Sequence, residues 1–179
     1  MDGYRLEKGM VQVYTGNGKG KTTAALGLAF RAVGRGLAVH MIQFVKGCEP
    51  CGEHLAAEKY APCFTIVQMG HKGWLGRGKP APEAVLMARK AFEMAREAVT
   101  CGRYDVVILD EINTAVSYGL VAVEDLLHLI REKGEHVELV LTGRNAAPEV
   151  MEAADLVTEM REVKHYFKAG VTARIGIEK

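Results

Sequence analysis

The chain has 179 residues, 49% of them hydrophobic, which suits one substantial core and is too little for two ordinary domains. Lys and Arg number 23 against 22 Asp and Glu, so a net charge of +1 provides no global field that would attract nucleic acid or an acidic membrane. No segment approaches the ~20 apolar residues of a membrane span, and residues 1–9 are polar, so we expect one cytoplasmic domain covering residues 1–179.

The first half of the chain alternates apolar runs with a helical pattern. Met10–Tyr14 is a short apolar run that ends at a glycine-rich loop, which is typical of a buried strand. Lys21–Val33 is rich in Ala and Leu and is followed by two glycines, so it predicts a helix. Further strands are expected at Ala38–Val45 and Phe64–Met69. The rest of 46–82 is rich in Gly, Pro and Lys and predicts mostly loop.

The second half repeats the alternation. Pro82 begins a helical pattern that continues to about Val99, with apolar residues recurring on one face at Val85, Ala88, Phe92, Ala95 and Val99. Val106–Leu109 is a branched apolar run closed by Asp110 and Glu111, as in a central strand. The remaining expected elements are helices at Val123–Lys133 and Pro148–Ala154 and strands at Val137–Leu141 and Leu156–Met160. This order predicts an α/β fold with a parallel sheet and helices on both faces.

The segment "YTGNGKGKTT" follows the first predicted strand and runs into the first predicted helix. Backbone N–H groups at a helix N-terminus suit phosphate oxygens, and glycine lets the backbone approach them closely. Lys21 would neutralise phosphate charge, and the Thr22 hydroxyl would bind magnesium. The pattern G-x-x-x-x-G-K-[ST] has Thr15 at its first position here, but the flanking strand and helix are correct. We therefore predict a polyphosphate-binding P-loop.

Asp110 and Glu111 stand at the end of an apolar strand, where a P-loop fold places its second magnesium-binding group. An acidic pair at a strand end can also be a solvated cap. With the P-loop in the same chain, a metal role for at least one of the two carboxylates is the favoured interpretation.

Five blocks of the sequence resemble one known family. They are "VYTGNGKGKTTAALGLAFRAVG", "VHMIQFVKG", "YDVVILDEIN", "LVLTGRNAAPEVMEAADLVTEM" and "VKHYFKAGVTARIGIE". Together they resemble the P-loop branch of the ATP:cob(I)alamin, or corrinoid, adenosyltransferases, from about Gly9 to Glu178. The resemblance implies a RecA-like P-loop NTPase fold with a mostly parallel central sheet. It also implies a homodimer and a reaction between ATP and a reduced corrinoid, with a flavoprotein-type reductant as a candidate electron donor.

The family transfers the 5′-deoxyadenosyl group of ATP to cobalt and releases triphosphate, with ATP lying reversed in the loop relative to P-loop hydrolases. Reduced cobalt needs no general base, so the protein has to align C5′ and stabilise the departing triphosphate. The resemblance assigns catalysis to Lys21, Thr22 and Glu111, and magnesium to Thr22, Glu111 and, as a companion, Asp110. It assigns nucleotide contact to Gly16, Asn17, Gly18, Lys19, Gly20, Lys21, Thr22 and Thr23. Arg31 and Arg144 are further candidates for nucleotide contact, with a surface arginine as the alternative.

Two features depart from the family pattern. The family uses an aromatic pair in a Phe-Thr-Trp setting to remove the lower axial ligand of cob(II)alamin, whereas "GHKGWLGRG" keeps Trp74 and has Lys72 in place of the phenylalanine. We predict that Trp74 contacts the corrinoid. Some members also carry an N-terminal helical lid over the corrinoid site, and only nine residues precede the first predicted strand here.

Other candidate chemistry is weaker. Cys48, Cys51, His54 and Cys63 could supply four zinc ligands, but one C-x2-C pair alone favours free thiols. His165, in "KHYFKAG", either shapes the ligand pocket or makes a structural hydrogen bond. Two rival functions remain: an ordinary P-loop ATPase or kinase, and a nucleotide-dependent corrinoid carrier. The sequence does not distinguish cobalamin, cobinamide and an a,c-diamide as the acceptor.

Overall fold

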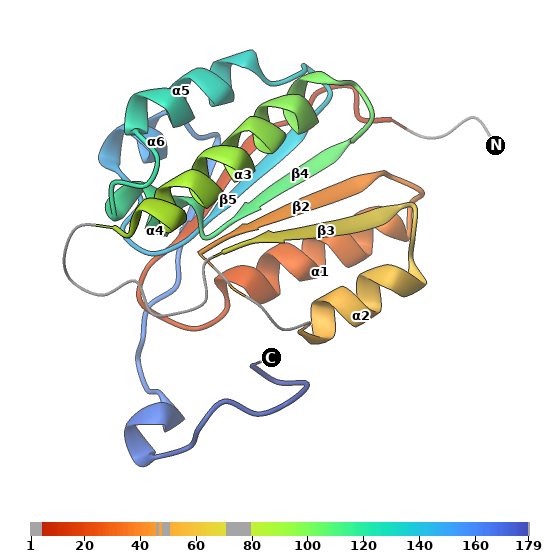
Figure 1. Ribbon diagram of the computed structural model, residues 1–179. Helices are drawn as coiled ribbons and strands as arrows, with labels where there is room; N and C mark the ends of the chain where they lie inside the picture. Colours follow the sequence, from red (N-terminus) through yellow and green to blue (C-terminus); the bar gives the residue numbers. More distant parts are fainter. Residues whose placement is uncertain (1–4, 46, 48–50, 71–79, 179) are drawn as a thin grey trace.

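The computed structural model describes residues 5–45, 47, 51–70 and 80–178, and within them six strands form one parallel sheet (Figure 1). Every pairing between neighbouring strands is parallel, and the order is β3-β2-β4-β5-β1-β6. The strands are β1 (Val11–Thr15), β2 (Val39–Phe44), β3 (Phe64–Met69), β4 (Val106–Asp110), β5 (Glu138–Thr142) and β6 (Leu156–Glu159). The predicted parallel α/β sheet is confirmed.

Helices cover both faces of the sheet, as Figure 1 shows. One face carries α1 (Lys21–Val33) and α2 (Gly52–Lys59), and the other carries α3 (Pro82–Thr100), α4 (Ile112–Ser117), α5 (Val123–Glu132) and α6 (Pro148–Glu152). Two separate hydrophobic clusters fill the two interfaces, because the central strands bury side chains on both of their faces. A short 3-10 turn, η1 (Tyr166–Ala169), follows β6 in the C-terminal segment.

Three expectations about local structure were wrong. The segment around Gly52–Lys59 was expected to be loop, yet it forms α2; only Ala57 of this helix is buried, so the hydrophobic periodicity that would reveal it is missing. The short α4 was also not predicted. In α3 the side chain of Val85 is exposed, and the buried face is made of Ala84, Ala88, Ala91, Ala95, Ala98 and Val99. These mostly small side chains let α3 lie close to the sheet.

The carboxyl ends of the strands meet at one edge of the sheet, where the candidate site lies. β1 leads into the glycine loop and β4 ends in Asp110, with β5 between these two strands. This is the RecA-like P-loop arrangement that the sequence predicted, and it brings the loop and Asp110 to the same edge. Among the described residues, no helix combines the length and apolarity needed to cross a bilayer.

Candidate functional site

The glycine loop is held against the chain segment that follows β6. Gly16 and Gly20 have φ angles of 93° and 125°, in the region that favours glycine, and Gly18 N–H donates to the Met160 carbonyl at 2.6 Å. A Cβ on Gly16 would lie 2.5 Å from the Met160 oxygen, and one on Gly18 would lie 2.8 Å from the carbonyl carbon of Arg161. These two glycines are therefore required by the packing of the loop itself.

Lys21 is buried within this loop at the start of α1. Its Nζ donates to the Gly16 carbonyl at 2.7 Å and to the Gly18 carbonyl at 2.8 Å. Burial lowers the pKa of Lys21, and the carboxylate of Glu111 partly opposes that shift. The Lys21 ammonium group is thus held by neutral carbonyl oxygens, at the position where a P-loop lysine contacts phosphate. A bound polyanion would supply the negative charge that these oxygens lack.

Thr22 and the end of β4 are joined by hydrogen bonds. Thr22 Oγ1 donates to Asp110 Oδ1 at 2.9 Å, and Thr142 Oγ1 donates to the same oxygen at 2.7 Å. The other oxygen, Oδ2, accepts from Gln43 Nε2 at 3.4 Å, and the Asp110 side chain is fully buried. The Asp110 carboxylate therefore orients the hydroxyl of Thr22.

Glu111 leaves the sheet in a strained conformation. Its φ and ψ of 63° and 19° are left-handed, which is rare for a residue other than glycine and is commonest at functional sites. The backbone N–H of Glu111 donates to Thr142 Oγ1 at 3.0 Å, and Thr114 Oγ1 donates to Glu111 Oε2 at 2.5 Å. Thr114 Oγ1 also accepts from the Arg144 N–H at 3.0 Å. These bonds hold Glu111 toward the loop.

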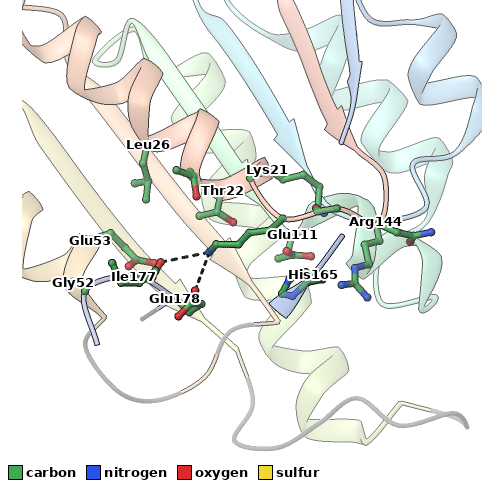
Figure 2. A pocket seen from close by; sticks show the side chains of 16 residues that line it. Lys21, Thr22, Leu26, Gly52, Glu53, Glu111, Arg144, His165, Ile177 and Glu178 are labelled. Atoms are coloured by element: carbon green, nitrogen blue, oxygen red, sulfur yellow. Dashed lines mark hydrogen bonds and ion pairs between the residues drawn. The ribbon is translucent and has the colours of Figure 1, made fainter. Parts of the chain in front are cut away.

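A pocket of about 500 Å³ lies over the loop. In Figure 2 its wall is formed by Glu53, Ile177 and Glu178 on the left and by Glu111, His165 and Arg144 on the right. Its lining residues are Asn17, Gly18, Lys19, Gly20, Lys21, Thr22, Thr23, Leu26, Gly52, Glu53, Glu111, Arg144, His165, Gly176, Ile177 and Glu178. The pocket is thus built by α1, α2, the ends of β4 and β5, and the C-terminal segment.

The C-terminal segment is tied to the loop through Lys19. Lys19 Nζ lies 3.8 Å from Glu178 Oε1 and donates to the Ile177 carbonyl at 3.4 Å, as the dashed lines in Figure 2 mark. Glu178 also pairs with Arg174 at 3.1 Å and accepts a short hydrogen bond from the Tyr166 hydroxyl. The hydrogen bonds from Arg174 and then Tyr166 lower the pKa of Glu178 to about 2, so this carboxylate is charged at neutral pH.

His165 serves both of the roles that were left open for it. Its Nδ1 accepts from the Phe167 N–H at 3.1 Å and so caps η1, and its side chain lines the pocket. Because Nδ1 accepts, the neutral ring carries its proton on Nε2 and can donate there.

The four residues weighed as zinc ligands, with free thiols as the favoured interpretation, are only partly close to one another. Donor atoms of Cys51, Glu53 and His54 lie within 4.8 Å of each other, but Cys63 is exposed and does not belong to this group. His54 Nδ1 accepts from the Cys51 N–H at 3.1 Å, which forms a capping box at the start of α2. This cap accounts for the closeness of Cys51 and His54. Cys48 lies outside the described residues.

Most of the predicted site residues meet at the pocket. The pocket is lined by Asn17 to Thr23, Glu111 and Arg144. The Gly16 carbonyl accepts a hydrogen bond from Lys21, and Asp110 accepts one from Thr22. Arg31 is not brought there: it lies in the last turn of α1, about 15 Å along the helix axis from Lys21, beside Phe30 and Tyr60. Trp74 and Lys72 lie outside the described residues, so the predicted corrinoid contact of Trp74 stays a prediction.

Several lining residues were missed. Leu26, Gly52 and Glu53 come from α1 and α2, and Gly176, Ile177 and Glu178 come from the C-terminal segment. No local motif marks them, because they reach the pocket only through tertiary packing. The family resemblance held the only signal: "ARIGIE" ends its last block, and Cys51-Gly-Glu overlays a loop of the family.

Comparison with known proteins shows the family of the chain. Residues 7–178 match the family described as ATP:corrinoid adenosyltransferase BtuR/CobO/CobP. Corrinoid adenosyltransferases of a Sinorhizobium species, of Escherichia coli K12 and of Salmonella typhimurium are 39%, 38% and 37% identical to the chain. Each match covers 96% of this chain, and 81%, 86% and 86% of the respective relative.

Among solved structures, flagellar accessory protein FlaH from Methanocaldococcus jannaschii aligns with a TM-score of 0.58. The alignment covers 86% of this chain and 72% of FlaH at 14% identity, so it shows a shared fold alone. The family match and the curated relatives, which cover nearly the whole chain, confirm the resemblance read from the five sequence blocks. The chain is a member of the ATP:corrinoid adenosyltransferase family BtuR/CobO/CobP.

Proposed function

We propose that this chain transfers the 5′-deoxyadenosyl group of ATP to the cobalt of a reduced corrinoid and releases inorganic triphosphate. The observation that carries the proposal is the convergence of the P-loop lysine, Thr22, Glu111 and Arg144 on one pocket, in a chain of this family. The apolar side chains of Leu26 and Ile177 extend the same pocket beyond the phosphate cradle, toward where a nucleoside would lie.

The charge of the pocket supports a divalent cation as part of the substrate complex. The lining cations Lys19, Lys21 and Arg144 are matched in number by the carboxylates of Glu53, Glu111 and Glu178. Side chains alone therefore do not neutralise a triphosphate, and the backbone N–H groups of the loop supply only part of the difference. Oxygen donors at Thr22 and Glu111 fit magnesium, which prefers hard oxygen ligands.

In the proposed reaction the cobalt electron pair attacks C5′ of ATP, a Co–C bond forms, and the C5′–O bond breaks. The departing triphosphate takes the electron pair of that bond. The loop N–H groups, Lys21 and Arg144 stabilise its growing negative charge, and magnesium bound by Thr22 and Glu111 would neutralise the rest. Asp110 keeps the Thr22 hydroxyl oriented through the 2.9 Å hydrogen bond. No general base is needed, because the reduced cobalt is itself the nucleophile.

The test is to mix the protein with MgATP and chemically reduced cob(I)alamin, and to follow adenosylcobalamin by its visible spectrum and the phosphate products by chromatography. We expect adenosylcobalamin and triphosphate in equal amounts. Lys21→Ala should abolish product, whereas Lys90→Ala, which removes an exposed lysine on α3, should leave the rate unchanged. Cobinamide and cobyrinic acid a,c-diamide as acceptors would identify the preferred corrinoid.

Two outcomes would contradict the proposal. Release of orthophosphate from ATP in the absence of corrinoid would indicate a P-loop hydrolase, for which Glu111 beside Asp110 would be the candidate base. Tight corrinoid binding with no Co–C bond formation would indicate a carrier. With Trp74 as a proposed corrinoid contact, Trp74→Ala should slow the reaction from cob(II)alamin and its reductant more than that from cob(I)alamin.

A further inference from the structure

Gln43 joins two carboxylates at the edge of the pocket. It lies on β2 directly opposite Asp110 of β4 in the parallel register, and its side chain is fully buried. Its Nε2 donates to Glu53 Oε1 at 3.1 Å and to Asp110 Oδ2 at 3.4 Å. One amide nitrogen therefore holds a carboxylate from α2 and a carboxylate from β4 on either side of it.

The carbonyl oxygen of the Gln43 amide differs from the nitrogen in its hydrogen bonding. Gln43 Oε1 is buried and has no hydrogen-bond partner among the described residues. A buried acceptor without a partner carries a desolvation penalty that an apolar side chain of the same shape would avoid. The benefit of glutamine at this position must then come from its two N–H donors, which means from placing Asp110 and Glu53.

Glu53 faces the pocket from the first turn of α2 (Figure 2). An acidic residue in a first turn interacts favourably with the helix dipole, which accounts for a glutamate in α2 but not for its bond to a buried amide. A carboxylate beside bound triphosphate would repel it, since both are anions. The repulsion turns into attraction only when a cation lies between them.

We propose that Glu53 is a further carboxylate for the magnesium ion of the MgATP complex, and that Gln43 is the positioning residue that holds Glu53 and Asp110 for this task. The inference rests on the proposed function for the identity of the ligand. The same amide also donates to Asp110, whose other oxygen accepts from the Thr22 hydroxyl, so Gln43 contacts both Glu53 and the residue that orients Thr22. Groups that orient metal-binding residues typically change metal affinity about 10-fold to 100-fold when they are removed.

The experiment measures ATP binding by calorimetry, once in excess magnesium and once in EDTA, without any corrinoid. The ratio of the two dissociation constants is the coupling between metal and nucleotide. Glu53→Gln should lower this coupling about tenfold, with weaker binding in magnesium and tighter binding in EDTA, because the repulsion is gone. Gln43→Met, which keeps the shape and removes the donors, should lower the coupling by a similar factor. Glu58→Gln, on an exposed position of the same helix, should match the wild type.

The double variant Gln43→Met/Glu53→Gln should lose less coupling than the product of the two single effects, because Gln43 acts in part through Glu53. The inference would be overturned if Glu53→Gln weakened ATP binding equally in magnesium and in EDTA, or changed it in neither. Glu53 is partly exposed, so this variant is expected to fold even if Gln43→Met does not. A wild-type protein that binds no ATP in either condition would instead overturn the proposed function itself.

Discussion

Thr22 Oγ1 donates to Asp110 Oδ1 at 2.9 Å, which connects the first turn of α1 directly to the buried carboxylate at the end of β4. The bond leaves the oxygen of Thr22 with lone pairs directed away from Asp110, and it sets the rotamer of the threonine. The orientation of Thr22 relative to β4 therefore depends on its hydroxyl group, and this dependence can be tested.

Thr22→Val should lower the adenosylation rate about 100-fold or more, because the isosteric methyl can neither bind magnesium nor donate to Asp110. Thr22→Ser should retain activity within a few-fold of the wild type, since its hydroxyl makes the same bond. Initial rates at saturating MgATP and cob(I)alamin provide the measurement. Equal rates for Thr22→Val and Thr22→Ser would contradict the assigned role of the hydroxyl.

ATP affinity should fall at alkaline pH, and at a lower pH than an ordinary lysine would give. Burial lowers the pKa of Lys21 in the free protein, and bound triphosphate favours the charged form and raises it again. As pH rises through the lowered pKa, Lys21 of the ATP-free protein loses its proton and the dissociation constant of MgATP increases. By the same linkage, the free energy of unfolding rises with pH between the lowered pKa of Lys21 in the folded protein and its pKa in the unfolded chain, because the unfolded chain binds more protons in this range.

Lys21→Arg is the control for this pH dependence, because a guanidinium group stays charged throughout the range. Its binding should be weaker overall yet flat between neutral pH and about pH 10. Titrations of MgATP binding at several pH values, with both proteins, decide the matter. A wild-type profile as flat as that of the arginine variant would show that Lys21 does not titrate in this window.

The two kinds of glycine in the loop–helix unit should respond oppositely to alanine. Gly16→Ala should lower the free energy of unfolding by about 2 kcal/mol or more, since its φ is 93° and the new Cβ would meet the Met160 oxygen at 2.5 Å. Gly27, inside α1, has nothing within 4 Å of an added Cβ, so Gly27→Ala should raise the free energy of unfolding by about 0.5–1 kcal/mol. Urea unfolding of both variants tests the contrast, and a stabilising Gly16→Ala would refute the packing argument.

The hydrogen bonds that Glu178 accepts within the C-terminal segment should be lost in acid. Hydrogen bonds from Arg174 and Tyr166 lower the pKa of Glu178 from its ordinary 4.5 to about 2, so these bonds are fully present above pH 4.5 and disappear as pH falls toward 2. NMR titration of the Arg174 amide, which donates to Glu178 Oε2 at 2.9 Å, reports this transition. In Glu178→Gln the transition should vanish; a wild-type midpoint near 4.5 would mean that the carboxylate is not held by its partners.

Much of the fold follows from local sequence patterns. Short apolar runs and helical periodicity located the six strands and the helices α1, α3, α5 and α6, because burial on one or both faces leaves a direct trace in residue order. The P-loop and Asp110–Glu111 were also readable from sequence, since phosphate and magnesium chemistry need particular residue types at close spacing. The helix α2 was not predicted from the sequence because it buries only Ala57.

The walls of the pocket were decided by tertiary structure alone. Glu53 and Glu178 are about 125 positions apart in the chain, and only the packing of α2 and of the C-terminal segment brings both to the loop. Arg31 shows the converse: it is close to the loop in sequence, but ten residues of rigid helix carry it away. Sequence motifs specify chemistry that is contiguous along the backbone, whereas charge balance around a ligand depends on distances across space, which only the folded chain defines.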